Sequence, residues 1–492
     1  MAARGASRAI DRRGPQRGGG HRHRADPARR AAYDVLEAVA DRDAYANLLL
    51  PRLLADRGIT GRDAALATEL AYGTLRGQGT YDAVLAACSD RPLDRLDLPV
   101  LQVLRMGAHQ LLATRVGSHA AVATSVDLAK DVAGPGPSGY VNAVLRRVAT
   151  RDLEQWMPIA APRPADDPDG YLAVRYSHQR WIVAAYREAL GGAGASLAEV
   201  EAEVEAALAA GNERPRVTMA IRPGAAERDA VLPEGAEPCR WSPYGFVLAG
   251  GDPAALMADG IAAVQDEASQ LAAVMLARCP VMPSSRPELD PGASPAPRPV
   301  PAWLDMCAGP GGKARMLAGL AALDGARLVA AELHPHRARL VASAVDEATT
   351  VIVADGREPA WRDVGFERVL VDVPCTGLGA LRRRPEARWR KSPDDLAGLG
   401  RLQRELLWSA LDAVRPGGVV AYVTCSPVPA ETSEVVLEVA GPAATGVEIL
   451  DAPALLPDVP GLRSTADPRF AQFWPHRHGT DAIFIALLRR TS

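Results

Sequence analysis

From residue 302 onward, short apolar runs alternate with stretches of helical pattern. The runs are 303–307 (WLDMC), 328–333 (LVAAEL), 349–356 (TTVIVADG), 367–373 (ERVLVDV) and 419–425 (VVAYVTC). Strands that are separated by helices pair in parallel, so this alternation predicts a mostly parallel, doubly wound α/β sheet. A later run at 482–490 (AIFIALLRR) has no helix after it and predicts an added antiparallel edge strand.

The N-terminal part of the chain has a different pattern. Residues 28–150 carry apolar side chains at helical spacing, as at Val35, Leu36 and Val39, and predict an all-α domain. Residues 1–27 are rich in Arg and Gly and predict a disordered basic tail. The tail is either a solubilising leader or an arm that contacts RNA phosphates.

A connector separates the two domains. Residues 151–260 predict one helix over 171–190 and then a small α+β region, and residues 261–492 form the α/β domain. Within that domain, the Pro- and Ser-rich stretch 280–301 predicts an exposed loop.

Composition excludes several classes of protein. The net charge is −3, so any contact with nucleic acid must come from local basic surfaces. No apolar run approaches the roughly 20 residues that span a bilayer, and the first 30 residues lack the apolar segment of a secretory signal. The cysteines show neither CxxC pairs nor metal-like His/Cys spacing, which predicts free thiols, no metal site and a cytoplasmic protein. They are Cys88, Cys239, Cys279, Cys307, Cys375 and Cys425.

A glycine-rich turn follows the first predicted strand and opens a helix. Glycines at such a turn let the backbone approach a ligand closely, with helix N–H groups aimed at it. A phosphate-binding loop is excluded, because Cys307 and Ala314 stand where Gly and Ser or Thr are needed. A purely structural tight turn is the alternative. The turn runs through Cys307, Ala308, Gly309, Pro310, Gly311, Gly312 and Lys313.

Carboxylates end the next two strands. Glu332 lies about 20 residues beyond the glycines, where an acidic side chain can hold ribose hydroxyls. Asp355 ends the third strand and either hydrogen-bonds an adenine amino group or forms an Asp-Gly turn. Since no phosphate-binding feature accompanies them, the set favours a nucleoside cofactor such as S-adenosylmethionine.

Two cysteines and an aspartate follow the fourth and fifth strands. Asp372 and Cys375 come after the fourth, and Cys425 comes after the fifth. Ligands bind at the carboxyl ends of strands in open α/β sheets, so these side chains are expected to meet in one crevice. Either cysteine alone would be an ordinary buried residue, but two beside prolines on adjacent strands favour a reactive site.

Several of these motifs together resemble a known family. LDMCAGPGGK, DVPCTGLGALRRRPEARWR, VAYVTCSP and WPHRHGTDAIF resemble the RNA 5-methylcytosine methyltransferases of the NOL1/NOP2/Sun family, over residues 262–490. Segments 70–87, 119–130 and 140–149 look like the helical RNA-binding domain of the antitermination factor NusB. This pairing resembles the family members that modify 16S ribosomal RNA.

The resemblance implies a fold, a cofactor and a reaction. The fold is a Rossmann-like, S-adenosylmethionine-dependent methyltransferase domain behind a NusB-like domain, in a monomer acting on small-subunit ribosomal RNA. It assigns Cys425 as the nucleophile that attacks cytosine C6, Asp372 as the contact to N3, and Cys375 to the later release step. The target base must be flipped out or unpaired.

Departures from the family pattern are modest. Val373 and Thr376 replace the usual Ala and Ser, Arg388 a common Lys, and 482–483 (Ala-Ile) the usual Gly-Phe. They bear on substrate position rather than on activity. Lys313 is one of three lysines, and its charge opposes the helix dipole, so we favour an active-site contact over a solvated lysine.

Two other functions stay open. A DNA cytosine-5 methyltransferase, or a tRNA methyltransferase that uses the same mechanism, would use Cys375 as its nucleophile and would not need Cys425. A non-catalytic RNA-binding assembly factor would explain the helical domain and basic tail, but not the paired cysteines above a glycine-rich turn.

Overall fold

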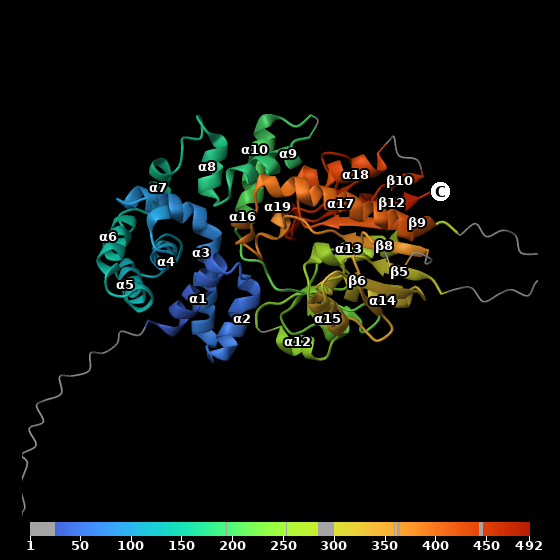
Figure 1. The fold of residues 1–492 in the computed structure, drawn as a ribbon, viewed down its shortest axis with the longest axis horizontal. Helices are drawn as coiled ribbons and strands as arrows, with labels where there is room; N and C mark the ends of the chain where they lie inside the picture. Colours follow the sequence, from blue (N-terminus) through green and yellow to red (C-terminus); the bar gives the residue numbers. More distant parts are fainter. Residues whose placement is uncertain are drawn as a thin grey trace, which may run out of the picture.

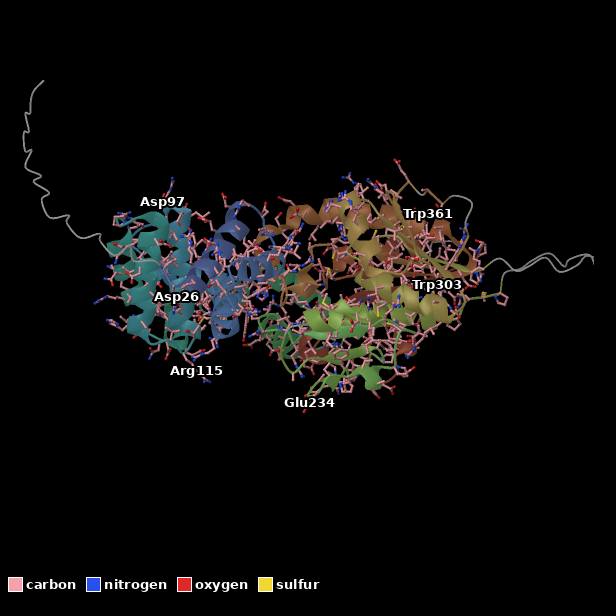
Figure 2. The ribbon with its side chains drawn as sticks, turned by 90° about the horizontal axis from the view of Figure 1, so that it is seen from below. Asp26, Asp97, Arg115, Glu234, Trp303 and Trp361 are labelled. Atoms are coloured by element: carbon pink, nitrogen blue, oxygen red, sulfur yellow. The ribbon has the colours of Figure 1, made fainter. Side chains whose placement is uncertain are left out.

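The computed structural model describes residues 25–192, 194–251, 253–283, 300–358, 360–361, 365–441 and 446–492. These residues form an all-helical lobe and an α/β lobe, with a smaller region packed between and along them (Figure 1). In Figure 2 the two lobes are again separate, with Asp26, Asp97 and Arg115 in the first and Trp303 and Trp361 in the second. Most of the predicted tail (1–27) and predicted loop (280–301) lies outside the described residues.

The helical lobe is built around the long helix α3. Asp26 caps the first helix by accepting a hydrogen bond from the Arg29 backbone N–H at 2.9 Å. Val35, Leu36 and Val39 are buried in the core of the lobe, as their spacing predicts. The elements are α1 (Pro27–Asp41), α2 (Ala46–Asp56), α3 (Gly61–Cys88), η1 (Leu93–Arg95), α4 (Leu98–Ala113), α5 (Ser118–Ala133) and α6 (Ser138–Val148).

The connecting region begins with four helices and ends in a four-stranded antiparallel sheet of order β2-β3-β1-β4. Its elements are α7 (Leu153–Ala160), α8 (Pro168–Arg175), α9 (Arg180–Leu190), α10 (Leu197–Ala210), β1 (Thr218–Ile221), α11 (Arg228–Val231), β2 (Glu237–Pro238), β3 (Gly245–Val247), α12 (Ala254–Ala258) and β4 (Ala262–Val264).

The single helix predicted over 171–190 is wrong. The helical conformation is interrupted between α8 and α9, where Ser177 adopts a φ of 57°. The break turns Ser177 toward two other segments: its hydroxyl accepts from the Gly79 N–H at 2.9 Å, and its carbonyl accepts from Arg388 at 2.8 Å. A tertiary contact therefore overrides the helical periodicity.

The α/β lobe contains an eight-stranded sheet among the described residues, with the path β10-β12-β9-β8-β5-β6-β7 and β11 paired to β12. Strands β5 to β9 are parallel, as predicted. The strands are β5 (Ala302–Asp305), β6 (Arg327–Glu332), β7 (Thr350–Val353), β8 (Phe366–Asp372), β9 (Val414–Thr424), β10 (Val447–Leu450), β11 (Ala471–Gln472) and β12 (Phe484–Arg490).

The late strand β12 is antiparallel to β9, as predicted, but it is not the edge of the sheet. Strand β10 pairs with its other side, from Val447 opposite Arg490 to Leu450 opposite Leu487. Four residues of mixed polarity give too little pattern to predict such a strand. Its pairing covers backbone groups that an edge strand would leave free.

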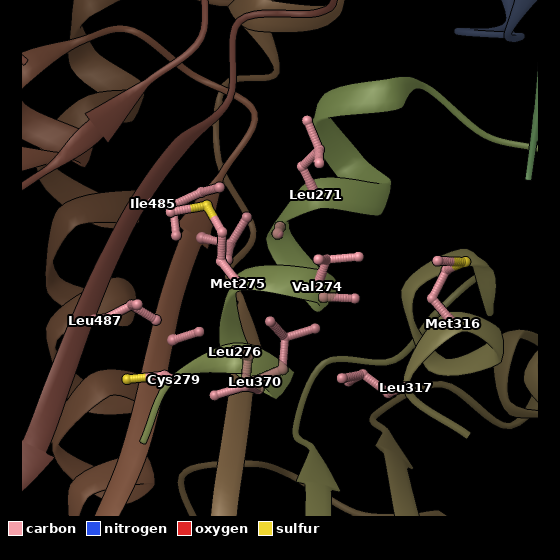
Figure 3. Close-up of a cluster of buried hydrophobic side chains, with 14 of the residues drawn as sticks. Leu271, Val274, Met275, Leu276, Cys279, Met316, Leu317, Leu370, Ile485 and Leu487 are labelled. Atoms are coloured by element: carbon pink, nitrogen blue, oxygen red, sulfur yellow. The ribbon is translucent and has the colours of Figure 1, made fainter. Parts of the chain in front are cut away.

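Helices cover both faces of the sheet (Figure 1). On one face, Leu271, Val274 and Met275 of α13 lie between Ile485 of β12 and Met316 of α14 (Figure 3). On the other face, α17 buries its apolar side against β8 and β9, and α18 packs against α17 and β10. The helices are α13 (Glu267–Arg278), α14 (Gly312–Leu323), α15 (Pro335–Ala344), η2 (Leu378–Ala380), α16 (Ala387–Arg390), α17 (Pro393–Ala413), η3 (Pro429–Glu431), α18 (Ser433–Ala440), η4 (Pro453–Leu455) and α19 (Pro475–His478).

The strand order fixes where a ligand can bind. The chain runs from β5 outward through β6 and β7, then returns to the other side of β5 with β8 and β9. Such a reversal opens a crevice at the carboxyl ends of the strands beside β5 and β8. None of the helices in the described ranges is long and apolar enough to cross a membrane.

Candidate active site

A cavity of about 820 Å³ opens at the carboxyl ends of β5 to β9. Seven of the predicted site residues line it together, and they come from five successive strand ends: Cys307, Gly309, Glu332, Asp355, Asp372, Cys375 and Cys425. The sequence-based expectation of one crevice is therefore met for these side chains. Ala308, Pro310, Gly311, Gly312 and Lys313 do not line the cavity, although they form the turn beneath it.

The glycine-rich turn is shaped by contacts that exclude side chains. Gly311 has a φ of 117°, and a Cβ there would lie 2.7 Å from that of Ala344. A Cβ on Gly309 would collide with the Glu332 carboxylate. Glycine is thus required at both positions, for a left-handed backbone at one and for a close approach at the other.

Glu332 ends β6 beside this turn and is 4% exposed. Its carboxylate accepts hydrogen bonds from the Gly309 N–H at 3.1 Å and from the His334 N–H at 3.0 Å. Asp355 lies further along the same wall and accepts from the Arg357 guanidinium at 2.7 Å. That hydrogen bond holds the pKa of Asp355 below its usual value. Both carboxylates can accept from hydroxyl or amino groups of a bound nucleoside.

Lys313 does not line the cavity itself, but it forms an ion pair with Asp372, which does. Its Nζ donates to the Asp372 carboxylate at 2.9 Å. Burial alone would lower the pKa of Lys313, but the charge and hydrogen bond of Asp372 raise it above its usual value. Asp305, fully buried at the end of β5, has its pKa raised to about 8 by burial and then by Asp372. Lys313 is therefore a fixed cation between the turn and Asp372.

The two cysteines after β8 and β9 face each other, with 3.2 Å between their sulfur atoms. A hydrogen bond from the Cys375 thiol lowers the pKa of Cys425, and the same bond raises the pKa of Cys375. Burial and the Asp372 charge act against this lowering at Cys425, and Lys313 and Arg384 offset them in part, whereas burial and Glu431 raise the pKa of Cys375. The hydrogen bond between the two sulfur atoms therefore favours a thiolate on Cys425 and a thiol on Cys375.

Glu431 joins the two cysteine loops and was missed by the sequence analysis. It is fully buried and accepts hydrogen bonds from the Thr376 N–H at 2.7 Å, the Thr376 hydroxyl at 2.5 Å and the Ser426 hydroxyl at 2.6 Å. Gln403 adds a fourth, at 3.3 Å. Because Thr376 follows Cys375 and Ser426 follows Cys425, this carboxylate fixes both sulfur atoms relative to each other.

Cations line the remaining wall, and one aromatic residue joins them. These were also missed, although the arginine-rich run 382–390 was a signal that could have found two of the cations. Tyr45, from the helical lobe, lines the same cavity and lies under the guanidinium groups of Arg384 and Arg390. The lining cations are Arg337, Arg357, Arg384, Arg390, Lys391 and Arg401.

Models of known families match both lobes. The model described as 16S rRNA methyltransferase RsmB/F matches residues 294–489, and that of the NusB family matches residues 26–150. A putative methyltransferase of Mycobacterium tuberculosis is 48% identical over 97% of this chain and 99% of its own length. Ribosomal RNA small subunit methyltransferase B of Pseudomonas putida is 33% identical over 83% of this chain and 87% of its own.

Solved structures share the fold. The crystal structure of PH0851 aligns with 94% of this chain and 99% of its own at a TM-score of 0.72 and 21% identity. The crystal structure of NSun6 from Pyrococcus horikoshii with SFG covers 63% of this chain and 98% of its own, at a TM-score of 0.50 and 16% identity. The predicted fold class, an all-α domain followed by a Rossmann-like, mostly parallel sheet, is confirmed.

Proposed function

Because this chain belongs to the RsmB/F family of 16S rRNA methyltransferases, we propose that it methylates carbon 5 of a cytosine in small-subunit ribosomal RNA. The methyl donor would be S-adenosylmethionine, and the attacking group Cys425. We expect the protein to be cytoplasmic, since a reducing compartment keeps such a thiol free. We also expect it to act as a monomer.

One observation carries this proposal: two cysteines whose sulfur atoms lie 3.2 Å apart at the ends of neighbouring strands, in the same cavity as Asp372. Cytosine C5 is too weak a nucleophile to accept a methyl group unaided. A thiolate that adds to C6 makes C5 electron-rich, and Cys425 is the cysteine whose pKa is lowered. A cysteine-based step at C6 therefore fits the site better than direct transfer.

The cofactor side of the cavity fits S-adenosylmethionine. Gly309 leaves room where a Cβ would collide with Glu332, and the Glu332 carboxylate is placed to accept from ribose hydroxyls. Asp355 lies on the same wall, where an adenine amino group can donate to it. When bound there, S-adenosylmethionine would supply an electrophilic methyl group. The analogue SFG in the NSun6 structure supports this choice.

The residues of this chain would then act in sequence. The Cys425 thiolate adds to C6 of a flipped cytosine, and N3 takes up a proton through Asp372, which Lys313 holds, and returns it when C5 is methylated. C5 would gain the methyl group as the S–CH3 bond of the bound sulfonium breaks, and S-adenosylhomocysteine would leave with the electron pair of that bond. With the assistance of Cys375 the C5 proton then leaves to solvent water, the electron pair of the C5–H bond forms the C5–C6 double bond, and the C6–S bond breaks so that its electron pair returns to Cys425. The aromatic ring is restored and the thiolate is regenerated.

Substitution of the two cysteines tests the proposal. Cys425→Ala should abolish methyl transfer to an unmodified small-subunit rRNA transcript and form no covalent protein–RNA species. Cys375→Ala should lose turnover for a different reason, because attack proceeds while release fails, so a denaturation-resistant adduct should accumulate. Cys425→Ser should not restore activity, since a hydroxyl is scarcely ionised at neutral pH. The readouts are radiolabelled methyl transfer and a gel shift.

Cys88→Ala is the matched control, since this thiol is buried in the helical lobe and should leave both readouts unchanged. An adduct with Cys425→Ala and none with Cys375→Ala would move the nucleophile to Cys375. No adduct from either would refute the covalent route, and no methyl transfer by the wild type would favour the non-catalytic assembly factor.

A further inference from the structure

Tyr45 is a residue of the helical lobe that lies in the cavity of the other lobe. It precedes the first residue of α2, is 46% exposed and lines the same cavity as Cys425. Nearly half of the surface of this aromatic side chain is therefore left uncovered by the protein. Its place in the cavity needs an explanation.

The α/β lobe makes hydrogen bonds to the backbone before and after Tyr45. Arg390 donates to the Ala44 carbonyl at 2.5 Å and to the Val39 carbonyl at 3.1 Å. Glu386 accepts from the Ala46 N–H at 3.4 Å. The segment before the ring and the residue after it are thus both tied to the α16 region, so the ring is positioned before any ligand binds.

Two guanidinium groups flank the ring. Arg384 lies 5.4 Å and Arg390 5.1 Å from the ring centroid, within the range of a cation–π contact. Arg384 also acts on the nucleophile, because its charge lowers the pKa of Cys425. Arg384, Tyr45 and Cys425 thus line one cavity, and Arg384 lies against the Tyr45 ring.

We propose that Tyr45 stacks on the RNA base next to the target cytosine, an assignment that rests on the function proposed above. The target ring must contact Cys425 and Asp372, and Tyr45 lines the same cavity as these two residues, where a neighbouring base can reach it. A partly exposed ring beside cations is the combination that single-stranded nucleic acid recognises, since bases stack on it and phosphates pair with the cations. The helical lobe thereby contributes a substrate-positioning residue to the active site.

Equilibrium binding to an unmodified small-subunit rRNA transcript tests this role. Tyr45→Ala should weaken RNA binding by about 10- to 100-fold, the range for loss of one stacked base. Tyr45→Phe should bind as the wild type does, because stacking does not need the hydroxyl. Tyr45→Leu keeps apolar bulk but has no π face, and should behave like Tyr45→Ala. The slope of log affinity against log salt should stay unchanged, since no phosphate contact is lost.

Trp408→Ala is the matched control, because Trp408 is 49% exposed on α17 and does not line the cavity. It should bind RNA like the wild type. Wild-type affinity of Tyr45→Leu would overturn the proposal in favour of simple apolar contact, and so would equal losses of RNA and S-adenosylmethionine affinity. Binding is measured without turnover, so a wild type that binds RNA but transfers no methyl group would refute the proposed function and leave this test intact.

Discussion

The cavity has two sides that are built in different ways. The cofactor side (Gly309, Glu332 and Asp355) comes from three successive strand ends, and its two carboxylates accept hydrogen bonds from backbone N–H groups of their own turn or of the neighbouring turn. The substrate side (Cys375, Cys425, Glu431, Arg384 and Tyr45) combines segments from residue 45 to residue 431, joined by side chains. The cofactor side therefore depends on short segments that follow neighbouring strands. The substrate side depends on the folding of distant segments of the chain against one another.

The comparison predicts that the two sides can be damaged separately. A change on the substrate side should alter RNA chemistry while the cofactor still binds, and the reverse should hold on the cofactor side. The cysteine and Tyr45 experiments above test the substrate side directly. Three further substitutions test how far the separation extends.

Glu431→Gln should have the largest effect. The amide keeps one acceptor but turns the other into a donor, which faces the Thr376 and Ser426 hydroxyls. Loss of buried hydrogen bonds to a charged group should lower the free energy of unfolding by about 3 kcal/mol. Misplacement of the two cysteine loops should reduce methyl transfer by about 100-fold. Calorimetry and radiolabelled transfer measure these two quantities.

S-adenosylmethionine affinity of Glu431→Gln, measured by isothermal titration, should stay at the wild-type value. Glu434→Gln, an exposed carboxylate three residues on, is the control and should change nothing. A matching fall in cofactor affinity would break the proposed separation of the two sides.

Glu332→Ala should have an intermediate effect, confined to the cofactor side. Removing the carboxylate should weaken S-adenosylmethionine binding by ~1–3 kcal/mol, the scale for leaving buried hydroxyl partners unpaired. RNA affinity should barely change. Glu367→Ala is the control: this strand carboxylate also contacts an arginine, Arg415 at 2.7 Å, but lies at the opposite end of the sheet. Equal losses of both affinities would mean that Glu332 supports the fold instead.

Arg401→Gln should have the smallest effect. This exposed side chain lines the cavity on α17, where a phosphate can approach it. Its loss should weaken RNA binding by less than about tenfold and reduce the salt slope by about 1, the signature of one phosphate contact. Arg404→Gln, whose side chain pairs with Glu438 at 2.5 Å, serves as the control. An unchanged slope would remove Arg401 from the phosphate contacts.

The difference between the two sides also explains what could be predicted from the sequence. The parallel strands, the glycine-rich turn and the carboxylates after it follow local rules, and the resemblance to the family is confirmed. Strand β10 was missed because four residues carry little pattern, and the helix over 171–190 was wrong because Ser177 turns toward Arg388. Glu431 and Tyr45 were missed because nothing near them in sequence shows what they contact. The roles of the site residues stay predictions.

The segment α16 has a consequence for how separable the two lobes are. Arg388 is fully buried, and its hydrogen bonds run to neutral oxygens: the carbonyls of Arg76, Ser177 and Gly211 and the side chain of Asn212. Burial lowers its pKa to about 9. A buried cation that loses such partners becomes strongly destabilising. Of these partners only the Arg76 carbonyl belongs to the helical lobe, but Arg390 and Glu386 of the same segment also bond to its backbone, at Val39, Ala44 and Ala46. Removal of the helical lobe would leave these groups of the α/β lobe without partners, so we expect it to lower the stability of the remaining protein.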